Sequence, residues 1–184
     1  MGYVSLACFF MPSVDVGHGK SYAMPKDGNS ATKMASILVR EEMVCMQADF
    51  LDAHERHWSD AEHLFQAQRW ANADHLYGMA AECGLKLLMI ALGMAYDEMH
   101  NRPTKHEDRV HANKVWLRYE SYRSGNVSAI GLALSAQNPF ADWDVSDRYA
   151  AQRNFNRSYV LPHQRGAQAV CDLLKEARRE GILG

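Results

Sequence analysis

The chain has 184 residues, with 20 lysines and arginines against 22 aspartates and glutamates. This near balance excludes a generally basic protein that coats nucleic acid, although it allows a local basic patch. Because 47% of the residues are hydrophobic and 10% are aromatic, the chain can bury a core and is not a disordered polymer. No apolar run approaches the roughly 18 residues that span a bilayer, so no membrane contact is expected.

The first 33 residues differ in composition from the rest of the sequence. We expect a flexible leader at 1–33 and a single helical domain at 34–184. A signal peptide is disfavoured because Pro12 interrupts the apolar run and no basic residue precedes it. The stretch GHGK at 17–20 lacks the first glycine of a phosphate-binding loop, since Val14 stands at that position, so no such loop is expected.

The cysteines and histidines give no strong metal signature. The four cysteines are too far apart in sequence for a CxxC motif, which favours a reduced, cytoplasmic protein over a disulfide scaffold. A cluster of histidines and acids between 54 and 63 has two interpretations, a metal-binding face or a solvated acidic helix, and we favour the second. No metal and no other cofactor is expected. The cluster consists of His54, His57, Asp60, Glu62 and His63.

Hydrophobic periodicity predicts an all-α fold, an up-and-down bundle of four to five helices. A polar first helix is expected from about 35 to 68, followed by a bend at 68–70. Within it, Ser59 and Glu62 have the spacing of a capping box, but the pattern also continues on both sides as in a helix interior. The second helix carries a broad apolar stripe from Ala73 to Leu92 and ends at Gly93.

Three further helices are expected in the second half. Thr104, with Glu107 three residues on, predicts an N-cap for a helix that ends at 124–126. A long irregular connection follows, in which an apolar patch (Ile130, Leu132 and Leu134) is expected to pack on the bundle. A short helix is then predicted near residue 145 with Ser146 as its cap. Pro162 is expected to separate it from a last helix at 163–180 that Gly181 terminates.

Charge is distributed unevenly along the chain. Residues 41–63 carry seven acids and one arginine, whereas residues 148–184 carry seven basic residues and three acids. These segments either neutralise each other across the bundle or leave a phosphate-binding cleft. The preference for arginine over lysine favours the cleft, and the candidate phosphate ligands there are Arg148, Arg153 and Arg165.

Several short motifs together resemble the HEPN superfamily (higher eukaryotes and prokaryotes nucleotide-binding). They are QRWA at 68–71, ADHLY at 73–77, AAECGLK at 80–86 and DRY at 147–149. The resemblance covers roughly residues 48–180. It implies a helical bundle that binds nucleotide or RNA phosphate or a protein partner, in a bacterial toxin–antitoxin or defence context. The expected partners are a second copy in a homodimer, a nucleotidyltransferase or antitoxin, and RNA or nucleotide.

The resemblance also implies a metal-independent endoribonuclease as an alternative function. Active members carry an arginine followed, after four to six residues, by a histidine that acts as acid or base on the RNA 2′-hydroxyl. Three pairs have this spacing: Arg56 with His63, Arg69 with His75, and Arg157 with His163. The first two lie in the helical first half and are interpreted as surface residues, so position favours Arg157 and His163 as the catalytic pair.

One acidic residue has two interpretations. Glu82 lies in the AAECGLK motif, four residues before Lys86. The resemblance implies a functional acid near the phosphate site, whereas the spacing alone indicates an ion pair within the helix. A third interpretation of the whole chain is a non-catalytic interaction bundle.

Overall fold

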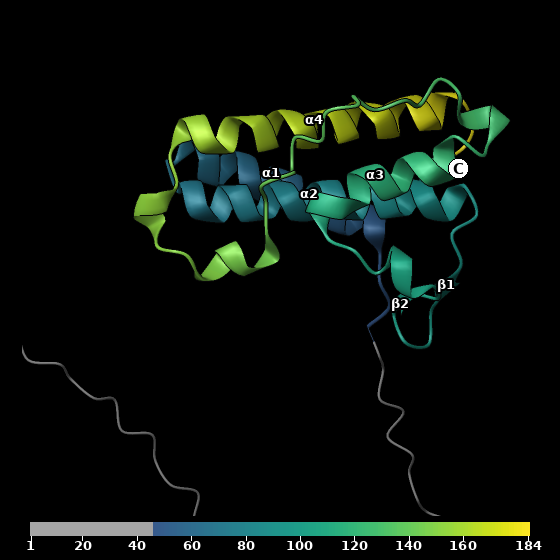
Figure 1. The fold of residues 1–184 in the computed structure, drawn as a ribbon, viewed down its shortest axis with the longest axis horizontal. Helices are drawn as coiled ribbons and strands as arrows, with labels where there is room; N and C mark the ends of the chain where they lie inside the picture. The colour runs from purple at the N-terminus through teal and green to yellow at the C-terminus, as the bar shows by residue number, and fades with distance from the viewer. Residues whose placement is uncertain (1–45) are drawn as a thin grey trace, which may run out of the picture. The chain divides into compact units, whose positions relative to one another are not determined.

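A computed structural model describes residues 46–184, so the expected leader at 1–33 and the beginning of the predicted domain lie outside the described residues. The described part contains four α-helices: α1 (Phe50–Gln66), α2 (Trp70–Ala91), α3 (Ala112–Arg123) and α4 (Arg157–Arg179). Helix α2 packs against each of the other three, and α4 runs alongside it (Figure 1). The predicted all-α bundle is confirmed.

Helix α1 begins where a side chain caps it. The Asp49 carboxylate accepts hydrogen bonds from the backbone N–H groups of Leu51 and Asp52, so α1 starts at Phe50. Residues 46–49 are not helical, contrary to the predicted helix from about 35, and the part of that prediction before residue 46 lies outside the described residues. Ser59 and Glu62 lie inside α1, which rules out the capping-box interpretation. The predicted bend is confirmed, because α1 ends at Gln66, Gln68 has φ of 60°, and α2 starts two residues later.

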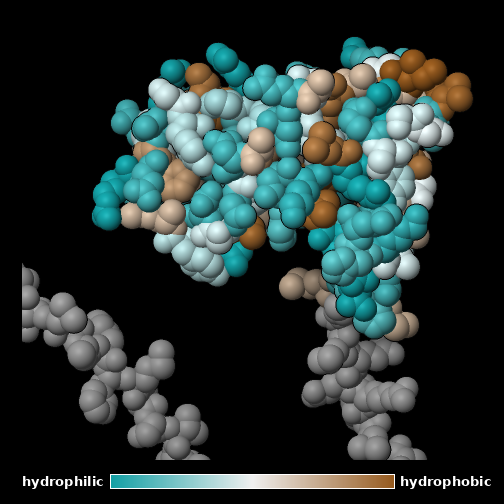
Figure 2. All heavy atoms as spheres, in the orientation of Figure 1, coloured by the Kyte–Doolittle hydropathy of each residue, from teal (hydrophilic) through white to brown (hydrophobic). Residues whose placement is uncertain are grey.

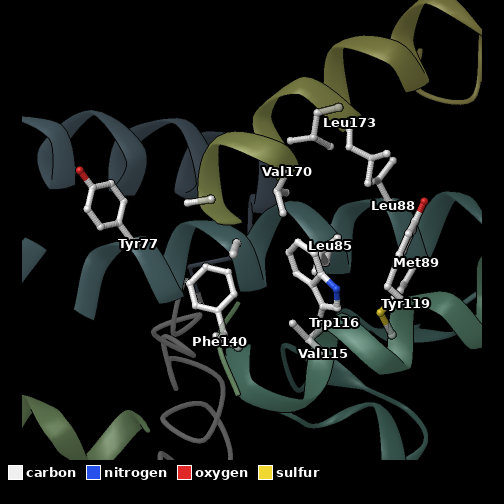
Figure 3. Packing of buried hydrophobic residues seen from close by; sticks show 14 of the residues in the cluster. Tyr77, Leu85, Leu88, Met89, Val115, Trp116, Tyr119, Phe140, Val170 and Leu173 are labelled. Carbon is white, nitrogen blue, oxygen red and sulfur yellow. The ribbon is translucent and has the colours of Figure 1, made fainter. Parts of the chain in front are cut away.

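Helix α2 is the central element of the core. Its apolar stripe is fully buried at Tyr77, Leu85 and Leu88. Leu85 and Leu88 lie among the α3 and α4 side chains shown in Figure 3, whereas Tyr77 packs with the Trp58 and Phe65 rings of α1. A Cβ on Gly84 would lie 2.6 Å from a Val170 methyl carbon, so the missing side chain lets α4 approach closely. The predicted end is also confirmed, since Gly93 follows α2 with φ of 102°.

The predicted start of the third helix is wrong. Thr104 follows a two-residue antiparallel pairing of β1 (Tyr96–Asp97) with β2 (Arg102–Pro103), a 3₁₀ turn follows at His106–Asp108, and α3 starts only at Ala112.

The reason is that the acids of this turn have other partners. Arg118 binds Glu107 at 2.7 Å and the fully buried Asp108 at 2.6 Å, and the Tyr122 hydroxyl also donates to Asp108. Glu107 is therefore not available to close a capping box with Thr104.

The connection from α3 to α4 is irregular, as predicted, and contains three short 3₁₀ helices at Val127–Ala129, Val145–Tyr149 and Gln152–Asn154. Asp144, not Ser146, caps the second of them. In the apolar patch Leu132 is buried, whereas Ile130 is 68% exposed. Trp143 is buried against α2, where its indole N–H donates to the Asp74 carbonyl at 3.1 Å.

Helix α4 passes through Pro162 without a break, so the predicted start at 163 is wrong. It begins at Arg157, where the Asn156 side chain accepts from the Tyr159 N–H. The fixed φ of a proline fits a helix, and Pro162 removes only one backbone hydrogen bond. The segment 157–161 therefore continues through Pro162 as part of α4. The predicted C-terminal glycine is confirmed, because Gly181 has φ of 71° and the next N–H bonds back to the Ala177 carbonyl.

Candidate functional site

One end of the bundle gathers segments that are far apart in sequence. The α1–α2 turn, the 3₁₀ helices before α4, and the first turn of α4 meet at the left of Figure 1. The Gln152 side chain accepts from the Ala71 N–H at 3.4 Å, and the Arg157 guanidinium lies 5.9 Å from the centre of the Phe65 ring. This end is mainly hydrophilic on the face that Figure 2 shows.

A cavity of about 620 Å³ opens at this end. Two of its lining residues are arginines, Arg69 and Arg148, and neither forms an ion pair within residues 46–184. No carboxylate of the described residues lines it, and the amino end of the 22-residue helix α2 adds partial positive charge. The cavity is thus suited to an anion. Its lining residues are Gln68, Arg69, Ala71, Asn72, His75, Leu76, Arg148, Ala150 and Gln152.

Arg148 is held by its neighbour in the chain. Its guanidinium lies 4.7 Å from the centre of the Tyr149 ring and donates to the Tyr149 hydroxyl at 2.9 Å. Because Tyr149 is 77% exposed, the pair places an aromatic face and a cation at the edge of the cavity.

His75 contributes a neutral imidazole to the cavity. Its ring stacks on Trp143 with a centroid distance of 5.7 Å and an interplanar angle of 16°. Burial and the charge of Arg148 lower the pKa of His75 below its usual 6.5, so the ring is uncharged at neutral pH. Its Nδ1 is buried and has no hydrogen-bond partner in the part of the chain that the structure describes.

His163 has a different environment, because it is buried between two carboxylates. Its Nδ1 lies 2.6 Å from Asp74 on α2 and its Nε2 lies 3.1 Å from Asp142 in the connection before α4. Burial by itself would lower the pKa of His163, but the hydrogen bond to Asp74 and both carboxylate charges raise it above 6.5. A protonated His163 therefore ties three segments of the chain together.

The structure does not bring the predicted catalytic pair together within one chain. Arg157 lies over Phe65 in the first turn of α4, while both nitrogens of His163 are bound to carboxylates and its side chain is 1% exposed. Six residues along a helix correspond to a rotation of about 240°, which turns the two side chains to different faces.

The candidate phosphate ligands are also separated. Arg148 lines the 620 Å³ cavity and Arg153 is exposed at the same end, whereas Arg165 lines another cavity farther along α4. Glu82 is grouped with neither, because its carboxylate binds Lys86 at 2.7 Å and His111 at 3.1 Å. Of the two interpretations of Glu82, the ion pair within the helix agrees with these contacts.

The structure instead joins a pair that the sequence interpretation set aside. Arg69 and His75 have the HEPN spacing and line the same cavity as Arg148. The bend at 68–70 was the available signal. Arg69 precedes the first residue of α2 and has a non-helical ψ of 62°, so the rotation that separates Arg157 from His163 along α4 does not apply to Arg69 and His75.

The histidine cluster of α1 does not converge on a metal. The His54 Nδ1 lies 2.8 Å from the Ala80 carbonyl and its Nε2 lies 3.4 Å from the Cys171 sulfur, while His63 bonds to the Ser59 carbonyl. Within residues 46–184 no group of three or more histidines, cysteines or acids could hold a metal ion.

No family model, curated protein or solved structure matches this chain. The resemblance to the HEPN superfamily therefore stays a prediction. In the described part of the chain, no helix has both the length and the apolar character that crossing a membrane requires.

Proposed function

We propose that the protein binds a phosphorylated ligand, a nucleotide or an RNA strand, in the cavity lined by Arg69, His75 and Arg148. The observation that carries the proposal is the lining itself: two arginines without carboxylate partners and a neutral imidazole, with no acid among them. Guanidinium groups bind phosphate oxygens through two parallel hydrogen bonds, and those without a carboxylate partner do so without first breaking an ion pair.

The edge of the cavity favours a ligand that also carries a base. Tyr149 exposes its ring beside Arg148, and stacking of a base on an aromatic side chain contributes about 1–3 kcal/mol. The amino end of α2 and the Gln68, Asn72 and Gln152 amides provide neutral hydrogen-bonding groups for ribose or phosphate oxygens. A homodimer, and a nucleotidyltransferase or antitoxin partner, remain predictions of the HEPN resemblance.

Binding of a fluorescein-labelled single-stranded RNA, followed by anisotropy at low salt, tests this proposal. We expect Arg69→Gln and Arg148→Gln each to weaken binding about tenfold or more, because a hydrogen bond to a charged group contributes about 1.5–3 kcal/mol. Arg102→Gln is the matched control, since Arg102 is exposed and unpaired in the described part but lies on β2. Absent binding, or equal binding by all three variants, would overturn the proposal.

A second candidate function is metal-independent RNA cleavage in the same cavity. It is favoured by the joint presence of Arg69 and His75, which have the arginine–histidine spacing that the HEPN resemblance implies. The neutral imidazole of His75 would accept the proton of the 2′-hydroxyl as that oxygen bonds to phosphorus, and Arg69 and Arg148 would stabilise the charge that develops on the phosphate. The bond from phosphorus to the 5′-oxygen would break, the 5′-oxygen would take a proton from water or from protonated His75, and a 2′,3′-cyclic phosphate would remain.

Cleavage of single-stranded RNA in EDTA distinguishes this candidate from binding alone. If His75 is the base, His75→Ala is expected to lower the cleavage rate about 100-fold or more while RNA binding falls much less. His106→Ala is the control, because His106 is an exposed histidine of the 3₁₀ turn at His106–Asp108 and lines none of the cavities described. A wild-type protein that does not cleave, or a His75→Ala variant as fast as wild type, excludes the candidate.

A further inference from the structure

A second cavity, of about 420 Å³, lies between the connection before α4 and the middle of α4 itself. It shares no residue with the anion cavity. Trp116 of α3 lies at its base, where the indole N–H donates to the Ser135 carbonyl at 2.9 Å. The lining residues are Trp116, Ser135, Gln137, Pro139, Pro162, Arg165, Gly166 and Ala169.

Arg165 is the only charged residue of this lining, and it has no carboxylate partner within residues 46–184. The basic residues near the end of the same helix are all paired: Lys175 with Asp172, Arg178 with Glu55, and Arg179 with Glu176. Arg165 thus places one uncompensated positive charge beside an otherwise neutral cavity.

The walls of the cavity are mainly apolar, and the connection before α4 packs closely against α4 there. A Cβ on Gly166 would lie 2.5 Å from the Pro139 ring, so the loop packs directly on the helix backbone. Pro162 is unfavourable inside a helix by about 3 kcal/mol, yet the sequence places it here, with an exposed ring that borders the cavity. The rings of Pro139 and Pro162 form the apolar surface of the cavity, whereas the Trp116 indole is 1% exposed and adds almost no surface to it.

We propose that this cavity binds a small organic anion with an aromatic body and a single carboxylate. The body would lie against Pro139 and Pro162, and the carboxylate would pair with Arg165. The volume lies in the usual range of small-molecule sites, which is about 300–1,000 Å³. One cation with apolar walls distinguishes this cavity from the anion cavity, which has two arginines and in which six of the nine lining residues are polar or charged.

A titration with phenylacetate, followed by ¹H–¹⁵N NMR of the full chain, tests the proposal. We expect phenylacetate to shift the Trp116 indole N–H and the Gly166 amide resonances, with saturation at millimolar concentration. Phenylacetamide has the same ring and no charge, so it should bind at least about fivefold more weakly because it cannot form the ion pair with Arg165.

Two variants complete the test. Arg165→Gln is expected to bind phenylacetate and phenylacetamide equally, because the exposed guanidinium is removed without disturbing the core. Arg153→Gln, an exposed arginine outside this cavity, should keep the discrimination of wild type. No shift at Trp116 and Gly166, or a preference for the anion that survives in Arg165→Gln, would overturn the proposal. Neither outcome affects the anion cavity, because no residue is shared.

Discussion

Replacing His163 by alanine is expected to lower the free energy of unfolding by about 3–5 kcal/mol, the cost of removing one partner from a buried ion pair. The Asp74 carboxylate, 1% exposed, would lose its 2.6 Å contact, and its other oxygen already has no hydrogen-bond partner in the described residues. Urea denaturation followed by circular dichroism measures the change. His106→Ala, at an exposed histidine, should change stability by less than about 0.5 kcal/mol.

The same buried pair should make stability depend on pH. The folded pKa of His163 lies above the 6.5 of an unfolded chain, because the contacts with Asp74 and Asp142 outweigh the effect of burial. Its contribution is therefore complete below pH 6.5 and is lost as pH rises through the folded pKa. We expect the urea midpoint of wild type to fall over that range and the His163→Ala midpoint to fall less. A small cost of the substitution, with an unchanged pH profile, would contradict the role assigned to His163.

Replacing Gly78 by alanine is expected to destabilise the protein by about 1–3 kcal/mol, although alanine is the better helix former by about 1 kcal/mol. A Cβ at this position would lie 2.2 Å from an atom of the Trp143 indole, and that ring is buried and fixed by its hydrogen bond to the Asp74 carbonyl. The bulky ring cannot move aside without leaving its site against α2.

Thermal unfolding of Gly78→Ala and of a control measures this effect. Gly131→Ala is the control, because a Cβ there meets no atom within 4 Å and the backbone φ is not in the left-handed region. We expect a lower melting temperature for Gly78→Ala and little change for Gly131→Ala. Because Trp143 also stacks on His75, the Gly78 variant should weaken RNA binding as well. A stabilised Gly78→Ala protein would show that the packing of Trp143 on α2 is not as described.

The helical elements with long apolar stripes could be predicted from the sequence. The apolar stripe from Ala73 to Leu92 is compatible only with a helix, because only a helix places residues at spacings of three and four on one buried face. The glycine ends of α2 and α4 were predictable for the same local reason, since φ above zero favours glycine.

The errors came from long-range contacts that no local pattern reveals. Thr104 and Glu107 have the spacing of a capping box, but Arg118 lies eleven residues after Glu107 and binds it. The preference for Arg157 and His163 assumed a helix that starts after Pro162. The structure continues α4 through the proline, and His163 then faces Asp74, 89 residues earlier in the chain.

The anion cavity was only partly predictable. The charge distribution predicts Arg148 at a phosphate site, whereas the position of Arg69 and His75 in the helical first half predicts surface residues. They reach the cavity because the connection before α4 folds back on the start of α2, where Gln152 meets the Ala71 N–H. The spacing of residues in the sequence cannot reveal this long-range contact between the connection and the start of α2.

The most direct test of the proposed anion cavity is a titration with adenosine 5′-monophosphate followed by ¹H–¹⁵N NMR. Binding in the cavity should give the largest shifts at the Ala71 and Asn72 amides and at the His75 ring, with the β1–β2 amides unchanged. Shifts centred outside the lining residues, or no shift at millimolar nucleotide, would contradict the function proposed for this end of the bundle.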